Sequence, residues 1–338
     1  LVGSEMCIRD RNGIESTRYL AVDESRMLAD PARYYKGGKP DLQLFDKKLY
    51  EVNPDDKVAI ARAAAEEVLG KDERIISVDS SYSDGEGSSY RLISNGFEGE
   101  SKSTWFSVSA SVSIKGEGEA RPQDYWYDSA LFYDKLTKTG IGAKALERVL
   151  RKLGQKKAKS GKYTMVVDPM NVGNLLSPML SALYGSALQQ KNSFLMDKLD
   201  TKVASDLFTL RDEPHAIGAN GSRYFDNEGV ATEPRTVFDK GVLKTYFIDT
   251  YNGKKMDIAP TISAPSRLIL TPGDKDLNGL VADIKQGILV TGFNGGNSNS
   301  STGDFSYGIE GFLIEDGKLT QPVNEMNVTG NMVTLWNS

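Results

Sequence analysis

Histidine and cysteine are almost absent from this sequence of 338 residues, which contains one of each, His215 and Cys7. Histidine is the commonest metal ligand among side chains and the commonest general base near neutral pH. A catalytic zinc ion takes three protein ligands, most often histidines completed by a carboxylate or cysteine. The sequence therefore excludes a zinc site of the His₂Glu or Cys₂His kind within this chain alone.

Other catalytic signatures are missing as well. His215 ends the turn-like segment Asp212-Glu213-Pro214-His215, and no Gly-x-Ser-x-Gly elbow supplies a nucleophile for a Ser–His–Asp triad. We interpret His215 as a loop histidine. The glycine-rich motifs that bind nucleotide phosphates or dinucleotides are also absent.

No apolar run approaches the roughly 20 residues that a membrane-spanning helix needs, so we expect no membrane segment. The net charge is −5, which argues against a broad nucleic-acid surface. One local basic run is interpreted as the solvated face of a helix and the linker after it: Lys144, Arg148, Arg151, Lys152, Lys156, Lys157, Lys159 and Lys162.

Residues 1–11, LVGSEMCIRDR, resemble a translated sequencing adapter and lack the layout of a signal peptide. We interpret them as a non-native leader and exclude them from the fold. Because Cys7 lies in this leader, the rest of the chain has no cysteine, which excludes disulfides and fits a reducing compartment. We therefore expect a cytoplasmic protein.

In the first half, Asn53-Pro54-Asp55-Asp56 is a typical helix start, and Gly70 a typical stop. Apolar periodicity predicts helices over 53–69 and 142–153 and strands over 90–93 and 106–114, the first strand leading into a turn at Asn95-Gly96. The lysine-rich residues 154–161 are interpreted as an inter-domain linker.

The second half is predicted to be richer in strands, at 163–167, 237–248, 268–270, 288–293 and 311–323, the last a hairpin turning at Asp316-Gly317. One helix carries the apolar stripe 175–183, with a kink or a start at Pro178, and another covers 277–286, stopped by Gly287. We predict an α+β fold of two domains, 12–160 and 161–338, the second sheet-rich.

Two segments are candidate binding sites. Asp226 and Glu228 could offer oxygens to a hard cation, but a turn with Asp226 as its cap and Gly229 at positive φ is favoured. The Gly/Asn/Ser-rich residues 294–303 could hold an anion with backbone N–H groups or form a mobile surface loop, and the sequence leaves both open.

From the linker onward, a series of short motifs resembles the TldD/PmbA family, also called modulators of DNA gyrase. The motifs, in order, begin at Tyr163 (YTMVVDP), Asn192 (NSFL), Val203 (VAS), Phe225 (FDNEGV), Lys240 (KGVLKTY), Thr302 (TGDFS), Gly311 (GFLIEDGK) and Pro322 (PV). Asn95-Gly96-Phe97-Glu98-Gly99 extends the resemblance more weakly into the first half.

The family has two kinds of subunit. The TldD type carries a His-Glu-x-x-x-His helix that binds zinc, and the TldE or PmbA type lacks it. In this chain the ligand positions fall on Leu176 and Ser181 and the glutamate position on Ser177, and residues 163–205 contain no histidine. The resemblance therefore implies a subunit without a metal or cofactor of its own, with zinc only in its partner.

The resemblance further implies a heterodimer with a TldD-type subunit that cleaves unfolded or extended peptides, or a homodimer when the chain is alone. Family members also extend beyond both ends of this sequence. Contacts to the peptide or to the partner are expected in two segments that follow family motifs: Asp226, Glu228 and Gly229, and Gly303, Asp304, Phe305 and Ser306.

Two alternatives remain open. The gyrase-modulator name suggests a non-enzymatic module that binds a protein partner, because the acidic balance argues against direct contact with DNA. The second alternative is a stand-alone hydrolase that uses Asp226 and Glu228, and it predicts that the Asp226→Asn variant loses activity.

Overall fold

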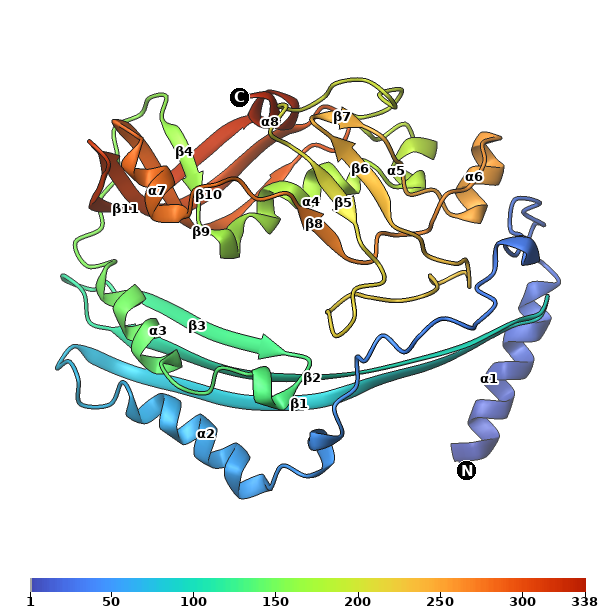
Figure 1. The fold of residues 1–338 in the computed structure, drawn as a ribbon, viewed down its shortest axis with the longest axis horizontal. Helices are drawn as coiled ribbons and strands as arrows, with labels where there is room; N and C mark the ends of the chain where they lie inside the picture. Colours follow the sequence, from blue (N-terminus) through green and yellow to red (C-terminus); the bar gives the residue numbers. More distant parts are fainter. Residues whose placement is uncertain (1) are drawn as a thin grey trace.

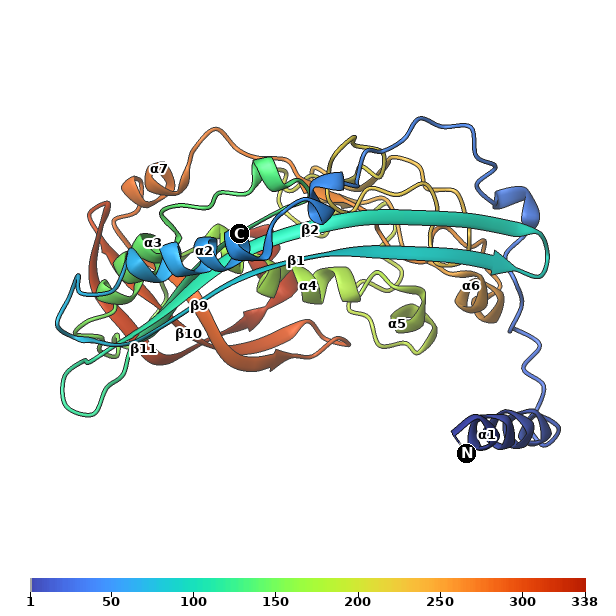
Figure 2. The same cartoon turned by 90° about the horizontal axis from the view of Figure 1, so that it is seen from below.

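The computed structural model describes residues 2–338, with side chains from Asp10 onward. It is a mixed α+β structure with three sheets in its described part, as the sequence predicted. Figure 1 shows the three-stranded sheet and its helices below a larger body that contains the other two sheets. Helix α1 (Val2–Thr17) includes most of the predicted leader, and Figure 2 shows it standing apart from the rest.

After α1, the first half contains the sheet β1-β2-β3, two further helices and short 3₁₀ turns. Their bounds are η1 Pro31–Arg33, η2 Lys47–Tyr50, α2 Pro54–Glu66, β1 Ile75–Ile93, β2 Phe97–Ile114, β3 Gln123–Ala130, η3 Tyr133–Lys135 and α3 Ile141–Leu150.

The second half contains the sheets β11-β10-β9-β4 and β7-β6-β5-β8. Its bounds are β4 Thr164–Val167, η4 Pro169–Asn171, α4 Gly173–Ser181, α5 Gly185–Gln189, β5 Leu210–Asp212, β6 Arg235–Asp239, β7 Val242–Leu243, α6 Thr250–Met256, β8 Leu268–Leu270, α7 Leu277–Ala282, β9 Gln286–Ser298, β10 Asp304–Glu315, β11 Lys318–Asn331 and α8 Met332–Asn337. None of the described helices combines the length and apolar character that crossing a bilayer requires.

Helix α2 begins where its sequence predicts. Asn53 accepts a hydrogen bond from the Asp55 N–H through its side chain, and Pro54 occupies the first turn. This arrangement satisfies one of the N–H groups that every helix leaves unpaired at its start. Gly70 has a φ of +73°, a conformation that glycine adopts without steric cost, and the chain turns there toward β1.

The first sheet buries one face and leaves the other accessible to solvent, as the alternation of apolar residues and serines in β2 predicted. Its inward residues are all at most 1% exposed and pack against α2 and α3: Phe106, Val108, Ala110, Val112 and Ile114. The intervening serines are partly exposed. Helices α2 and α3 therefore cover the same face of the sheet, and their contact has to be close.

The β1–β2 hairpin is much longer than the strands predicted at 90–93 and 106–114. Its ladder pairs Ile75 with Ile114 at one end and Ile93 with Phe97 at the other. Figures 1 and 2 show the two strands running well beyond α2 and α3. The turn at Asn95-Gly96 is where the sequence predicted it, with Gly96 at φ +105°.

The hairpin tip, residues 93–99, packs against the second half of the chain and against the segment 29–34 that precedes the first sheet. The Phe97 ring is 1% exposed and lies with its centroid 5.2 Å from that of Tyr34 and 5.0 Å from that of Phe225. The Asn95 side-chain amide donates to the Ala29 carbonyl at 2.9 Å. A residue of the first sheet thus belongs to the core of the second half.

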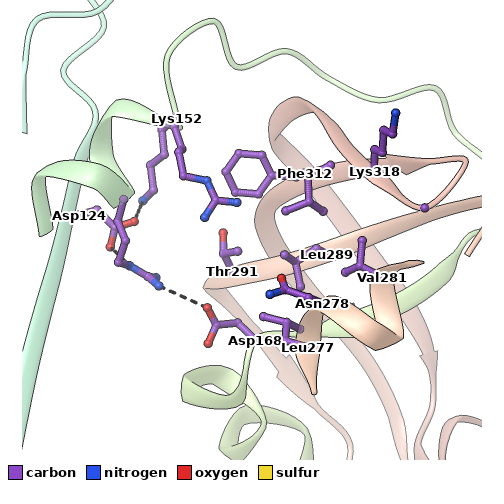
Figure 3. A pocket seen from close by; sticks show the side chains of 14 residues that line it. Asp124, Lys152, Asp168, Leu277, Asn278, Val281, Leu289, Thr291, Phe312 and Lys318 are labelled. Carbon is purple, nitrogen blue, oxygen red and sulfur yellow. Dashed lines mark hydrogen bonds and ion pairs between the residues drawn. The ribbon is translucent and has the colours of Figure 1, made fainter. Parts of the chain in front are cut away.

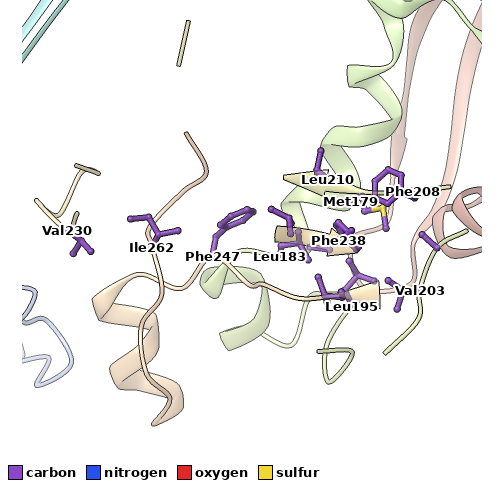
Figure 4. Packing of buried hydrophobic residues seen from close by; sticks show 14 of the residues in the cluster. Met179, Leu183, Leu195, Val203, Phe208, Leu210, Val230, Phe238, Phe247 and Ile262 are labelled. Atoms are coloured by element: carbon purple, nitrogen blue, oxygen red, sulfur yellow. The ribbon is translucent and has the colours of Figure 1, made fainter. Parts of the chain in front are cut away.

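That core gathers buried side chains of the second half between Met179 and Ile262, and Figure 4 shows part of it. Its largest fully buried members include Phe238, Phe247, Leu183, Leu195 and Leu210. They come from β5, β6, the residues before α5 and α6, and the segment after α5. The many short elements of this region are held by this shared core, because no single strand there is long enough to be stable alone.

Four predictions about the second half need correction. Residues 244–248, predicted as strand, follow the end of β7 at Leu243 and form only an isolated bridge, between Phe247 and Tyr184. Residues 294–298 of the predicted loop belong to β9, where Gly296 and Asn297 pair with Tyr307 and Ser306 of β10. Only 299–303 form the turn. Backbone pairing overrides the low strand propensity of glycine and asparagine here.

Helix α7 ends at Ala282 and not at 286, and Gly287 lies inside β9. A Cβ on Gly287 would come within 2.6 Å of the Thr164 carbonyl oxygen, so glycine is required there by a close strand approach rather than by a helix end. Pro178 lies inside α4, so the helix does not begin at this residue.

The contact between α2 and α3 gives a stability prediction. A Cβ on Gly142 would lie 1.9 Å from the Ala64 carbonyl oxygen, whereas a Cβ on Gly173, at the start of α4, would meet no atom within 4 Å. We expect Gly142→Ala to lower the free energy of unfolding by about 2–3 kcal/mol through overpacking. Gly173→Ala should change it by less than about 1 kcal/mol, in the stabilising direction. Urea denaturation of both variants checks this, and equal effects would contradict the close helix contact.

Candidate functional site

The first predicted segment, residues 226–229, is a tight turn that packs against the hairpin tip. The buried Asp226 carboxylate accepts hydrogen bonds from the N–H groups of Glu228 and Ser263, both at 2.9 Å. Gly229 has a φ of +79°, and a Cβ there would lie 2.6 Å from the Phe97 ring. Asp226 thus caps the turn and Gly229 adopts a positive φ, as the sequence favoured. The turn packs against the ring of Phe97.

Glu228 joins this turn to helix α6. Its Oε2 accepts hydrogen bonds from the Thr250 N–H at 3.0 Å and the Thr250 hydroxyl at 2.9 Å. Burial raises the pKa of Glu228, against the hydrogen bonds from Thr250, which favour the carboxylate. Both carboxylates of the segment are occupied by structural hydrogen bonds, which weakens the hypothesis of a hydrolase built on Asp226 and Glu228.

The second predicted segment, residues 303–306, follows the turn between β9 and β10. The Asp304 carboxylate accepts hydrogen bonds from the Asn331 amide at 2.9 Å and the Thr302 hydroxyl at 2.7 Å, and these bonds lower the pKa of Asp304. Gly303, at φ +81°, brings its backbone against the ring of Phe194. This geometry ties the turn to the last residue of β11.

The remaining two residues of this segment differ in their surroundings. Phe305 is buried with Leu175 and Met332. Ser306 pairs with Asn297 in the β9–β10 ladder. The segments 226–229 and 303–306 therefore have separate hydrogen-bond partners, one set near the hairpin tip and the other near the end of β11.

Helix α4 occupies the place where the resemblance puts a zinc-binding helix. Leu175 and Met179 on this helix are buried, and Leu176 packs partly buried against the main core. Ser177 and Ser181 are exposed and carry no metal-binding nitrogen or thiolate. These side chains do not fit a zinc ion, whose preferred ligands are imidazole, thiolate and carboxylate. Across the described residues, no group of three or more His, Cys, Asp or Glu side chains is placed to hold a metal.

The single histidine lies in the loop that the sequence predicted. His215 Nε2 lies 3.1 Å from the Thr232 hydroxyl oxygen, and its ring centroid lies 4.9 Å from that of Tyr224. Burial, together with the nearby Lys39, lowers the pKa of His215. Its hydrogen bond to a hydroxyl group that itself donates to the Arg223 carbonyl gives it a structural role in this loop.

The sequence did not predict a buried ionic cluster where the two halves meet; Figure 3 shows part of it, with Asp124, Lys152 and Asp168 labelled. We call it the junction network; it consists of Asp124, Arg148, Lys152, Asp168 and Glu310. Lys152 Nζ lies 2.7 Å from Glu310 Oε1 and 3.2 Å from Asp124 Oδ2. Arg148 lies 3.2 Å from Asp124 and 3.3 Å from Asp168. Five side chains from distant parts of the sequence thus converge on the end of α3.

The interpretation of the basic run as a solvated helix face was therefore wrong for Arg148 and Lys152. The Lys152 side chain is 9% exposed and that of Arg148 13%. Burial opposes the charge of Arg148, but Asp124 and Asp168 outweigh it and hold its pKa above the usual value. The i, i+4 spacing of Arg148 and Lys152 indicates that they share one face of a helix, but their carboxylate partners could not be identified from the sequence.

Comparison with known proteins covers both halves of the chain. The family models described as the PmbA/TldA metallopeptidase central domain and C-terminal domain match residues 47–153 and 160–338. A Haemophilus influenzae protein named Metalloprotease PmbA homolog is 30% identical over 334 residues, which cover 95% of this chain and 72% of that protein. The chain belongs to the TldD/PmbA family.

Solved structures of similar proteins agree with this membership. A Bacteroides thetaiotaomicron protein named a modulator of DNA gyrase has 71% sequence identity and a TM-score of 0.96, covering 99% of this chain and 77% of its own. TldE from Thermococcus kodakarensis has a TM-score of 0.77 at 22% identity, covering 95% of this chain and 74% of its own, and so shares the fold.

Glu228 predicts a pH effect on stability. A carboxyl group whose pKa is raised by folding stabilises the fold below its ordinary pKa, and that contribution is lost as the pH rises through the folded-state pKa. Because glutamine does not ionise, the Glu228→Gln variant does not lose stability in this way as the pH rises. We therefore expect the stability of Glu228→Gln relative to the unchanged chain to increase from acidic to neutral pH in urea denaturation. The control Glu119→Gln, whose side chain is fully exposed, should show no such trend; a flat difference for Glu228→Gln would be inconsistent with burial of its charge.

The junction network predicts a large effect on stability. Lys152→Met leaves the carboxylates of Asp124 and Glu310 without their shared cation, and breaking a buried pair in this way should cost about 3 kcal/mol. Lys157→Met removes an exposed ion pair with Glu325 and should cost less than about 0.5 kcal/mol. Thermal and urea unfolding measure both, and similar losses would show that the network is solvated.

Proposed function

We propose that this chain is a subunit of a peptidase complex that provides no catalytic zinc, and that its partner is a TldD-type subunit that binds the metal. The observation that carries this proposal is helix α4. Leu175, Leu176 and Met179 use the helix to fill the core, and the serines at the remaining motif positions are weak metal ligands.

The family membership supports a role in proteolysis. The Haemophilus relative is named a metalloprotease, and the Thermococcus protein of the same fold is named TldE. If a partner subunit binds the zinc, a role in proteolysis is compatible with the shortage of histidine and cysteine in this chain. We place the complex in the cytoplasm, because the scarcity of cysteine fits a reducing compartment.

The substrates that we propose are unfolded or extended peptides. The sheet β11-β10-β9-β4 has β11 and β4 at its edges. An extended peptide can add to such an edge through main-chain hydrogen bonds, which are largely independent of its sequence. The segment 303–306, which includes the start of β10, adjoins the end of β11 through Asn331 and is our proposed contact to the peptide or the partner.

The test combines metal analysis with reconstitution. The chain purified alone should contain substoichiometric zinc and should not cleave an unfolded reporter peptide, whereas mixing it with a His-Glu-x-x-x-His subunit from the same genome should give a zinc-containing, active complex. A matched control is the partner with its motif glutamate changed to glutamine, which should assemble without activity.

Tightly held zinc and peptide hydrolysis in the isolated chain would contradict the proposal. Co-purification with a topoisomerase, and failure to assemble with the zinc subunit, would favour the gyrase-modulator alternative that the name of the Bacteroides structure suggests. Size-exclusion chromatography of the isolated chain also tests whether it forms a homodimer.

A further inference from the structure

A pocket of about 330 Å³ opens beside the junction network, between the end of α3, helix α7 and the sheet that contains β9 and β10. Figure 3 shows its labelled side chains. One wall is apolar and consists of Leu277, Val281, Leu289 and Phe312. Pockets of this kind, at a domain junction with an apolar wall and few polar groups, are common sites for small ligands.

The cations around the pocket fall into two groups. Arg148 and Lys152 are engaged by the carboxylates of the junction network. Arg151 and Lys318 also line the pocket, but among the described residues neither has a carboxylate within 4.0 Å. Glu315, which pairs with Lys318 across the β10–β11 turn, forms no ion pair with it in the described structure.

Arg151 is held in place without a carboxylate partner. Its guanidinium carbon lies 4.7 Å from the centroid of the Phe312 ring, in the range of a cation–π contact. Stacking restricts the side chain but leaves its N–H donors available, because the ring interacts with the face of the guanidinium group. Arg151 is exposed to solvent beside the apolar wall, so its N–H donors are accessible to a ligand.

We propose that this pocket binds an apolar carboxylate. The carboxylate would lie beside Arg151, whose guanidinium group can donate paired hydrogen bonds, and Lys318 on the rim of the pocket adds positive charge. The apolar part of the ligand would cover Leu277, Val281 and Leu289. A bare phosphate would leave this wall uncovered, which is why the apolar carboxylate is favoured.

Two sources share this chemistry: the C-terminal residue of a peptide and a small apolar acid. Only the peptide source rests on the proposed function. Because Arg151 follows α3 and Lys318 begins β11, either ligand would contact both halves of the chain. Binding to the folded state should then raise the unfolding temperature.

The experiment is calorimetric titration of the isolated chain with three probes. They are an N-acetylated tetrapeptide that ends in leucine with a free carboxylate, the same peptide with a terminal amide, and N-acetyl-leucine. We expect the free acids to bind and the amide to bind at least about tenfold more weakly, because it offers no charge to the two cations.

The variants Arg151→Gln and Lys318→Gln should each weaken binding of the acid about tenfold, with unchanged unfolding temperatures in the absence of ligand. The matched controls Arg121→Gln and Lys162→Gln, at exposed positions outside this pocket, should leave binding unchanged.

Tighter binding of the tetrapeptide than of N-acetyl-leucine would identify a peptide C-terminus as the ligand, and equal binding would identify a small acid. Equal binding of acid and amide, no binding of any probe, or equal losses in the control variants would overturn the proposal. None of these outcomes depends on zinc or on a partner subunit, so a failure here is distinct from a failure of the proposed function.

Discussion

Phe97, at the tip of the β1–β2 hairpin, inserts into the core of the second half and holds the two halves of the chain together. The β1–β2 hairpin extends beyond its own helices, and its tip places Phe97 among Tyr34, Phe225 and the turn at Gly229. Burial of a phenylalanine side chain contributes about 1.5–3 kcal/mol, which a long and otherwise exposed ribbon needs if it is to keep one position. The close packing of the turn at 226–229 therefore serves to hold the hairpin tip.

The junction network fixes the opposite end of the same sheet. Arg148 lies in the last turn of α3 and Lys152 just after the helix, and their partners come from β3, from the segment after β4 and from β10. Buried ion pairs of this kind add little net stability, but they penalise any arrangement that separates the charges. With both ends held, the pocket between α3, α7 and the C-terminal sheet has a defined shape, as a binding site requires.

Local features of the fold could be predicted from the sequence, and those set by distant contacts could not. The cap at Asn53 and the turn at Asn95-Gly96 depend on neighbouring residues and were predicted correctly. The strand character of 294–298 depends on β10, and the burial of Lys152 depends on Glu310, 158 residues away. For the candidate site, the turn roles of Asp226 and Gly229 were predictable, but the pocket residues were not, because charge patterns do not reveal which cations lack partners.

If the hairpin tip joins the two halves into one cooperative unit, native-state hydrogen exchange should detect it. The amides of Phe97 and Gly99 at the tip should open with the same free energy as that of Phe238 in the core of the second half. Rapid exchange at Phe97 and Gly99 while Phe238 stays protected would show that the tip leaves the core independently, and would contradict the account.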